Sequence, residues 1–433
     1  MRQVLKTTAI IVTACLLCRH DANGQSSRAT RVATRDWPQF RGPGGQGVSD
    51  AKGVPVTWSA TQNLRWKTEL PGAGSSSPII VGDRVFVTCY SGYNVRGQAK
   101  GDMNQLQRHV LCFNAARGEL LWRKDVPAAL PESDSVREHG YAASTPASDG
   151  RRLYVFFGKS GVFAFDSDGK PLWRTDVGTN VHGWGSAASP ALYKNLVIVN
   201  ACVESESLVA LDKNTGKEVW RARGITESWN TPQIVANTNG KPELVVAIVG
   251  KLLGFDPDTG QLLWTCETSI PWYMAPSVIA QNGIVYAIGG RGDGVSALAV
   301  RAGGRGDVTS THRLWTGTKG SNVSSPVFHE GHLYWMHDSL GIAYAADATT
   351  GRIIYEERLP RAGQVYASPV LADGKLYYVT RGGRTFVLKA GPKYELLAVN
   401  DLSDGSTFDA SPAVADGQLY LRSDRFLYCV GNK

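Results

Sequence analysis

The chain has 433 residues, including 48 glycines and 20 prolines, and 19% of its residues are charged, compared with about 25% in a typical globular domain. Its hydrophobic fraction of 42% excludes a disordered or fibrous protein. The many glycines and aromatic residues favour short strands joined by tight turns over a helical bundle. The net charge of +8 is spread along the chain without a long run of one sign, so we expect no nucleic-acid partner.

Residues 1–24 predict a secretory signal peptide. Arg2 and Lys6 provide a positive start, an apolar stretch follows at residues 7–18, and small residues close the segment. The apolar stretch, at about twelve residues, is shorter than the roughly 20 that a membrane-spanning helix needs. We therefore expect an exported protein of the periplasm or cell envelope. Cys15 follows a lipobox-like Val-Thr-Ala, so its lipidation is the one membrane attachment that the sequence allows.

Cysteines are sparse in the remaining chain and form no adjacent or Cys-x-x-Cys pair. They are Cys89, Cys112, Cys202, Cys266 and Cys429. Most lie within apolar, strand-like segments, which predicts buried thiols. Export would also permit disulfides, and a bond between Cys89 and Cys112, on successive predicted strands, is the alternative.

A small residue followed by proline recurs eight times along the chain. The prolines are Pro78, Pro146, Pro190, Pro232, Pro276, Pro326, Pro369 and Pro412. A short apolar stretch, a polar turn and alternating strands follow each of these pairs. Four strands in a repeat of about 43 residues are typical of one propeller blade. The sequence therefore predicts an all-β, eight-bladed β-propeller built from four-stranded antiparallel blades.

The third and fourth strands of the clearest repeats are joined by a turn with the pattern Asp-x-x-Thr-Gly, followed by a tryptophan. In residues 210–220, the Asp212 carboxylate can accept hydrogen bonds from backbone N–H groups of the turn, and Gly216 can take a positive φ. The same turn explains Asp166 to Gly169 without a calcium ion. The tryptophans are expected to dock blades together. They are Trp66, Trp122, Trp173, Trp220, Trp264 and Trp315.

The last repeat, residues 411–430, has three strands and lacks its tryptophan strand. Residues 63–70 match the missing strand. An N-terminal strand that completes the last blade would close the ring and remove exposed sheet edges, an arrangement known as Velcro closure. We thus expect the propeller at residues 63–433, an extended Pro/Gly-rich arm at residues 25–62, and a monomer.

The Ala-Leu-Asp-x-x-Thr-Gly-x-x-x-Trp pattern after a Ser-Pro start resembles the PQQ-like repeat of quinoprotein alcohol dehydrogenase-type propellers, which BamB-type assembly factors share. The resemblance covers about residues 63–433, and residues 37–43 look like the opening segment of exported propellers of this kind. It implies the propeller fold. For function it implies either a non-catalytic binding or scaffold module in the cell envelope, or a PQQ- and calcium-dependent dehydrogenase that acts on alcohols or sugars.

The residues that a dehydrogenase of this family would use are not matched in the sequence. The chain has no Cys-Cys pair, and no Glu, Asn and Asp can be aligned with the family's motif. The sequence therefore assigns no catalytic residue and no metal ligand, and it leaves open whether the protein is an enzyme. PQQ and calcium are possible cofactors that are implied only by the resemblance to the family. The intact blade motifs favour a scaffold with a protein or peptide partner at the propeller face.

Residues just before the small-Pro pairs should gather around the mouth of the central channel, because the links between blades share one face. The insertions at residues 91–109 and 127–143 are expected there too. Aromatic faces beside a few charges suit a flat or extended ligand, although the same side chains would also pack as a plug. The predicted ligand or partner site comprises His139, Tyr141, His182, Trp184, Trp229, Asn230, Tyr273, Arg291, Asn322, Tyr366, Arg381 and Asp409.

Overall fold

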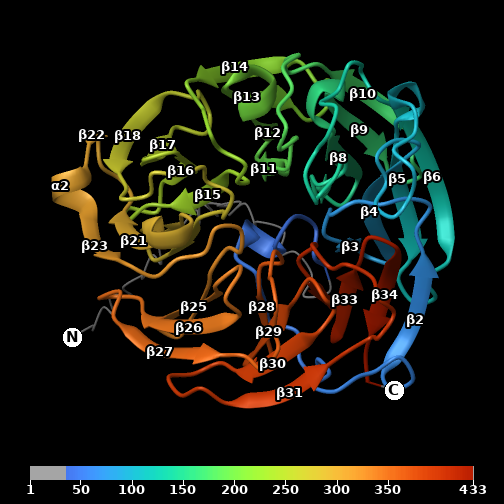
Figure 1. Ribbon diagram of the computed structural model, residues 1–433. Helices are drawn as coiled ribbons and strands as arrows, with labels where there is room; N and C mark the ends of the chain where they lie inside the picture. The colour runs from blue at the N-terminus through green and yellow to red at the C-terminus, as the bar shows by residue number, and fades with distance from the viewer. Residues whose placement is uncertain (1–35, 433) are drawn as a thin grey trace, which may run out of the picture. The chain divides into compact units, whose positions relative to one another are not determined.

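The computed structural model describes residues 36–432, which belong to one folded unit. The predicted signal peptide and Cys15 lie outside the described residues. Eight sheets surround a central channel (Figure 1), which confirms the all-β, eight-bladed propeller. Helices in this part of the chain are short, with α1 at Cys202–Ser205 and α2 at Thr309–His312. No helix in the described region has the length and apolarity needed to cross a membrane.

The first four blades follow one another in chain order. Blade 1 contains β3 (Ile79–Val81), β4 (Arg84–Ser91), β5 (Gln107–Asn114) and β6 (Leu120–Pro127). Blade 2 contains β7 (Ala147–Ser148), β8 (Arg152–Phe156), β9 (Val162–Asp166) and β10 (Pro171–Thr175). Blade 3 contains β11 (Ala191–Tyr193), β12 (Leu196–Ala201), β13 (Ser207–Asp212) and β14 (Glu218–Arg223). Blade 4 contains β15 (Gln233–Ala236), β16 (Pro242–Ile248), β17 (Lys251–Phe255) and β18 (Leu262–Glu267).

The other four blades complete the ring. Blade 5 contains β19 (Ile279–Gln281), β20 (Ile284–Gly289), β21 (Ser296–Arg301) and β23 (Arg313–Gly317). Blade 6 contains β24 (Val327–His329), β25 (His332–Met336), β26 (Ile342–Asp347) and β27 (Ile353–Arg358). Blade 7 contains β28 (Val370–Ala372), β29 (Lys375–Val379), β30 (Thr385–Lys389) and β31 (Leu396–Asn400). Blade 8 contains β32 (Ala413–Ala415), β33 (Gln418–Arg422), β34 (Phe426–Val430) and β2 (Leu64–Glu69).

Two blades carry a fifth strand that the repeat pattern did not predict. The two-residue strand β1 (Val48–Ser49) pairs in parallel with β28 of blade 7. The strand β22 (Gly306–Asp307) pairs in parallel with β18 of blade 4. The sequence does not predict either strand, because a two-residue segment is too short to show a hydrophobic periodicity.

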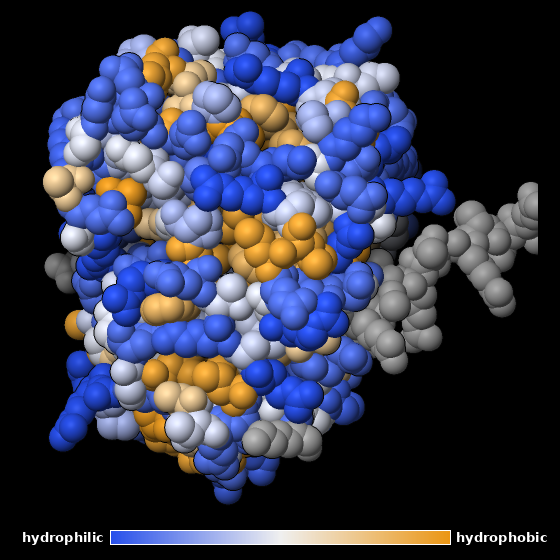
Figure 2. Space-filling model, turned by 90° about the vertical axis from the view of Figure 1, so that its right-hand side faces the viewer, coloured by the Kyte–Doolittle hydropathy of each residue, from blue (hydrophilic) through white to orange (hydrophobic). Residues whose placement is uncertain are grey.

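The middle strands of each blade are apolar on both faces, since neighbouring blades cover both sides of the sheet. All six residues of β12 are buried, and so are six of the eight in β4. The outer strands face solvent on one side, and their burial alternates instead. Figure 2 shows one side of the rim, where hydrophilic residues dominate and apolar residues form separate patches. The hydrophobic core therefore lies between blades, and a single blade could not bury it alone.

The ring closes where the two ends of the propeller meet. The N-terminal strand β2 pairs antiparallel with β34, with Trp66 opposite Cys429 and Glu69 opposite Phe426. Figure 1 shows β2 as the outer strand of the C-terminal blade. This confirms the predicted Velcro closure.

The outer-strand tryptophans join consecutive blades. The indole N–H of Trp66 donates to the carbonyl of Ala115 in the next blade, and its ring lies 2.6 Å from where a Cβ on Gly118 would stand. Gly118 has a φ of +70°, so both conformation and space require glycine there. Equivalent bonds from four other tryptophans reach the next blade's turn. They are Trp122 to Ser167, Trp173 to Lys213, Trp220 to Pro257, and Trp315 to Ala348.

Trp264 departs from this pattern. Its indole N–H donates to Oε2 of Glu243 within blade 4, at 2.8 Å. Blade 5 lacks the Asp-x-x-Thr-Gly turn that would receive it, and the segment containing β22 covers this edge of blade 4 instead. Trp264 is buried in a hydrophobic cluster that includes Val285 and Val300 of blade 5, so it packs at the junction of the two blades although its indole hydrogen bond stays within blade 4.

A belt of hydroxyl groups links the inner strands around the channel. At each step the backbone N–H of a belt residue donates to the hydroxyl of the belt residue in the next blade, at 2.8–3.0 Å. The belt runs through Ser77, Thr145, Ser189, Thr231, Ser277, Ser325, Ser368 and Ser411. In blade 5 the hydroxyl belongs to Ser277, after the proline, because Ala275 has none. Between blades 8 and 1, Arg422 donates to the carbonyl of Ser76 instead, at 2.7 Å.

Residues 37–49 cross the channel at the end opposite the cavity described below. Trp37 exchanges two backbone hydrogen bonds with Ile80 of blade 1. Further along, the side chain of Gln46 accepts from Ala280 N in blade 5, and Gly47 O accepts from Leu371 N in blade 7. This segment appears in blue at the centre of Figure 1. It is therefore held by blades on several sides of the ring.

The cysteines in the described chain are all buried and free. Cys89 lies opposite His109, and Cys112 lies opposite Phe86, so the two thiols are not paired with each other. The prediction of buried thiols is confirmed, and the alternative Cys89–Cys112 disulfide is wrong. Burial raises the pKa of both thiols to about 12, so neither is a reactive thiolate near neutral pH.

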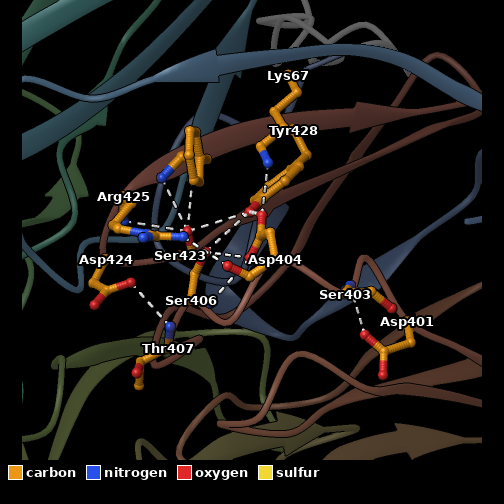
Figure 3. A network of polar contacts seen from close by, with 11 residues as sticks. Lys67, Asp401, Ser403, Asp404, Ser406, Thr407, Ser423, Asp424, Arg425 and Tyr428 are labelled. Atoms are coloured by element: carbon orange, nitrogen blue, oxygen red, sulfur yellow. Dashed lines mark hydrogen bonds and ion pairs between the residues drawn. The ribbon is translucent and has the colours of Figure 1, made fainter. Parts of the chain in front are cut away.

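Asp404 ties the N-terminal strand to blade 8 (Figure 3). Its carboxylate lies 2.9 Å from Lys67 Nζ on β2 and accepts hydrogen bonds from Tyr428 on β34 and from Ser406. Burial alone would raise the pKa of Asp404, but the hydrogen bonds from Ser406, Tyr428 and Lys67 outweigh it and lower the pKa to about 2. The ionised carboxylate therefore stabilises the closure.

We expect Asp404→Asn to lower the free energy of unfolding at pH 7 by about 1–3 kcal/mol, since the substitution removes charge-assisted hydrogen bonds at the closure. Because folding lowers this pKa, the stabilisation is fully present above about pH 4 and declines as the pH falls toward 2. Urea unfolding at pH 7 and pH 3 measures the difference. Asp401→Asn, which alters a more exposed carboxylate, is the control and should cost less. Equal losses in the two variants would contradict the role of Asp404.

Candidate functional site

A cavity of about 530 Å³ occupies one end of the central channel. The hydroxyl belt lines its deeper part, and Phe40 from the crossing segment also contributes to the wall. Loop residues that precede the inner strands form its mouth. Every blade contributes residues to the wall of the cavity, and its volume lies in the range of small-molecule ligand sites.

Aromatic side chains from three consecutive loops form one side of the mouth. The ring centroids of Trp184 and Tyr273 are 5.2 Å apart, and those of Trp229 and Tyr273 are 5.6 Å apart with the rings nearly perpendicular. The guanidinium of Arg137 stacks on Trp184 with its Cζ 4.2 Å from the ring centroid. Trp229 is fixed further by a hydrogen bond from its indole N–H to Gly185 O, at 2.7 Å. The aromatic wall is therefore rigid before any ligand binds.

An ion pair forms the opposite side. Arg381 binds Asp409 through two nitrogens, at 2.6 and 3.3 Å, and both side chains are largely buried, with exposures of 12% and 8%. The guanidinium also lies over Tyr366, at 4.2 Å from the ring centroid. Burial raises the pKa of Asp409, although Arg381 opposes the shift. Burial would lower the pKa of Arg381, but Asp409 reverses the effect and the net shift is upward.

A polar cluster joins the two sides. The backbone N–H of Asn322 donates to Asp338 Oδ1 at 3.2 Å, and its side-chain amide donates to Tyr273 Oη at 3.0 Å. His337 lies beside Asp338, with 3.6 Å between Nδ1 and Oδ1. Burial lowers the pKa of His337 despite the nearby carboxylate, so its imidazole is neutral at pH 7.

His139 comes from the insertion at residues 127–143. Its Nε2 is buried and makes no hydrogen bond with any residue in the described chain. Burial lowers the pKa of His139, so this imidazole is also neutral at pH 7. Its role in the cavity is that of a polar wall residue.

Most of the residues predicted from sequence do converge on this cavity. Those that line it are His139, Trp184, Trp229, Tyr273, Arg291, Asn322, Tyr366 and Asp409. Arg381 stands behind the wall and holds Asp409. His182 lies just outside, with its ring 5.3 Å from Trp229.

Tyr141 and Asn230 do not face the cavity. Tyr141 is buried between blades 1 and 2, where it contacts the rings of Tyr90 and Tyr93. Asn230 is buried, and its amide bonds the backbone of Ala247 and Met274. Tyr141 and Asn230 both lie close to a small-Pro pair, but this position in the repeat does not determine the direction of a side chain, because the local turn sets it.

The predicted set omitted several lining residues. These are Phe40, Arg137, Glu138, His337, Asp338 and Gln364. Glu138 and Gln364 lie in the same loops as His139 and Tyr366, so the loop pattern could have included them, whereas Asp338 lies in the turn between β25 and β26. Phe40 had no such signal, since it reaches the cavity only because its segment crosses the channel.

The cavity offers a poor donor set for calcium. Calcium takes six to eight oxygen ligands, and within residues 36–432 no group of three or more His, Cys, Asp or Glu side chains could hold a metal ion. Asp409 is already paired with Arg381, and Asp338 accepts from Asn322. These residues do not fit a calcium-dependent quinone site.

Comparison with known proteins places the chain in a family. Residues 106–357 match the family model described as outer membrane protein assembly factor BamB. The chain is 24% identical to the BamB of Burkholderia pseudomallei over 361 residues, which cover 81% of this chain and 82% of that protein. The match to a family model over more than half of its length shows that this chain belongs to the BamB-type, PQQ-like propeller family.

Quinoprotein enzymes are also similar to this chain. It is 25% identical over 200 residues to a polyvinylalcohol dehydrogenase of Pseudomonas, covering 41% of this chain but only 28% of that enzyme. The quinohemoprotein alcohol dehydrogenase of Comamonas testosteroni superposes with a TM-score of 0.63 at 13% identity, over 94% of this chain and 82% of that one. At this identity, the superposition shows a shared fold alone.

We expect Asp409→Asn and Arg381→Met each to lower the free energy of unfolding by about 3 kcal/mol, because either change leaves the partner's buried charge or polar group without its counterpart. The double variant Arg381→Met/Asp409→Leu should lose less than the sum of the two single variants. Thermal and urea unfolding measure all three. Strict additivity would show that the pair is not coupled.

Proposed function

We propose that this protein is an exported, non-catalytic scaffold of the periplasm or cell envelope, and that the channel mouth binds a peptide segment of a partner protein. The observation that carries the proposal is the rigid aromatic wall of Trp184, Trp229 and Tyr273 beside Arg137. Tryptophan, tyrosine and arginine are enriched among the few residues that dominate the binding energy of protein interfaces, and side chains that are already ordered lose little entropy on binding. Membership of the BamB-type family supports an assembly or scaffold role.

The charges at the mouth suit a segment that carries a carboxylate. Arg137 and Arg291 each stack on an indole ring, Arg137 on Trp184 and Arg291 on Trp272, and neither has an ion-pair partner within the described chain. The carboxylates of Asp338 and Asp409, in contrast, already have partners. An acidic side chain or a C-terminal carboxylate would thus find free guanidinium groups beside an apolar wall. The protein is expected to act as a monomer.

The alternative function is a PQQ- and calcium-dependent dehydrogenase that acts on alcohols or sugars. The similarity to polyvinylalcohol dehydrogenase and to a quinohemoprotein alcohol dehydrogenase favours it, and the cavity has aromatic faces against which a planar ring could stack. The absence of a matching calcium donor set in the described residues argues against it.

Site-specific photo-crosslinking tests the scaffold proposal. A photoreactive residue at position 184 should trap a discrete envelope protein in growing cells, whereas the same residue at position 397, on outer strand β31, should not. For the peptide identified in that adduct, Trp184→Ala should weaken binding by roughly tenfold or more. Leu397→Ala is the control, because Leu397 is exposed on outer strand β31 and does not line the cavity.

The opposite results are equally informative. Equal crosslinking at positions 184 and 397, or unchanged peptide affinity in Trp184→Ala, would contradict a partner site at the mouth. Saturable binding of PQQ with calcium, together with dye reduction in the presence of alcohols or aldoses, would establish the dehydrogenase alternative.

Export predicts a defined mature end. If the signal peptide is removed after residue 24, the mature chain begins at Gln25, and the mass of the protein purified from the envelope fraction should show this. A lipid-modified mass beginning at Cys15 would instead show membrane attachment. An intact chain from Met1 in the cytoplasm would contradict export.

A further inference from the structure

Three polar side chains outside the cavity form a hydrogen-bonded chain across blade 1. Ser91 ends β4, His109 lies on β5 and Asp125 lies on β6. Ser91 Oγ is 2.8 Å from His109 Nε2, and His109 Nδ1 is 2.7 Å from Asp125 Oδ1. The strand register places Asp125 directly opposite His109, so three adjacent strands hold the arrangement. None of the three residues lines the channel cavity.

The protonation states suit a general base. Burial lowers the pKa of His109, although the hydrogen bond with Asp125 opposes the shift. The hydrogen bond from Arg123, and then that from His109, lowers the pKa of Asp125. At pH 7 the imidazole is therefore neutral and the carboxylate is ionised. Asp125 accepts the Nδ1 proton, which leaves the lone pair of Nε2 directed at the hydroxyl of Ser91.

The carboxylate is itself held in place. Arg123 Nε and Nη2 lie 2.5 and 3.2 Å from the two oxygens of Asp125. The side chain of His109 has an exposure of 0%, whereas that of Asp125 has 45%. The imidazole is thus fixed between its two partners, and Ser91 is the member of the chain that stands at the end of its strand.

The backbone beside Ser91 offers a donor for a developing negative charge. Gly92 follows Ser91 with a φ of +86°, and its N–H makes no backbone hydrogen bond with any other residue in the described chain. In many acyl hydrolases the N–H that follows the nucleophile stabilises the oxyanion. Gly72, on the other side, also lacks a side chain, and a Cβ there would stand 3.4 Å from Cβ of Ser91. A Cβ would stand 1.9 Å from Gln105 O at Gly92 and 2.1 Å from Tyr90 O at Gly72, so the backbone packs closely around the end of β4.

We propose that Ser91, His109 and Asp125 form a hydrolytic triad that cleaves small carboxylic esters at this end of blade 1. Ser91 and His109 are the catalytic residues, and Asp125 is the positioning residue that orients the imidazole. The site is independent of the partner site at the channel mouth, so either one can fail without affecting the other.

The reaction needs only an ester and water. Ser91 Oγ attacks the carbonyl carbon of the ester while His109 Nε2 takes the hydroxyl proton. The resulting oxyanion accepts a hydrogen bond from the N–H of Gly92. The C–O bond to the leaving group then breaks, and the alcohol departs with the proton from His109. A water molecule, deprotonated by His109, attacks the acyl-enzyme, and the carboxylic acid leaves as Ser91 regains its proton.

A fluorophosphonate probe tests the nucleophile directly on the mature, unmodified protein. We expect a stoichiometric covalent adduct, and peptide mapping should place it on Ser91. Hydrolysis of p-nitrophenyl acetate should fall to the background rate in Ser91→Ala. Because the pKa of His109 lies below its usual value, the rate should already be on its plateau at pH 7 and should decline in more acidic buffer.

Two further variants separate catalysis from structure. Asp125→Asn should slow labelling of Ser91 by roughly tenfold or more, since the amide no longer fixes the imidazole tautomer. Ser133→Ala is the matched control: its hydroxyl bonds only the backbone of Ser135, so labelling and hydrolysis should not change. Thermal unfolding checks that each variant is folded. Absence of an adduct on wild-type Ser91, or equal hydrolysis by Ser91→Ala, would overturn the proposal. Ser91 and Asp125 would then serve only as hydrogen-bond partners of the buried imidazole of His109.

Discussion

The coupling between blades is the constraint on which the rest of the structure depends. Each blade is a small sheet that is apolar on both faces, so it becomes stable only when a neighbour covers each face. Hydroxyl groups couple the inner strands, and indole rings couple the outer strands to the next turn. The final junction, where β2 pairs with β34 and Asp404 binds Lys67, gives the first and last blades the neighbour that a linear array would lack.

Closure of the ring also creates the candidate site. Trp184, Tyr273 and Asp409 come from blades far apart in the chain, and they meet around one cavity only because the blades are arranged in a circle. The loops that carry them are anchored at both ends by buried strands. A propeller of this family can therefore present a rigid set of side chains for binding, and the chemistry of that set, more than the fold, decides between a scaffold and an enzyme.

Departures from the repeat show where tertiary structure overrides the local pattern. Trp264 has the sequence context of a docking tryptophan, but it binds Glu243 in its own blade, because the next blade has no turn to receive it. Ser277 takes the belt position that Ala275 cannot fill. The Ser91–His109–Asp125 chain follows no sequence motif, since its members are brought together by strand pairing alone.

The sequence by itself determined the number of blades, their four-stranded plan and the closing strand, because turns, prolines and alternating apolar residues are local signals that recur with each repeat. It also indicated eight of the residues that line the cavity, since loops at equivalent repeat positions share one face. Only the tertiary structure decided which side chains of those loops turn inward, as Trp184 does and Tyr141 does not. It also decided that residues 37–49 cross the channel and bring Phe40 to the cavity. These outcomes depend on contacts between distant segments, which no local pattern encodes.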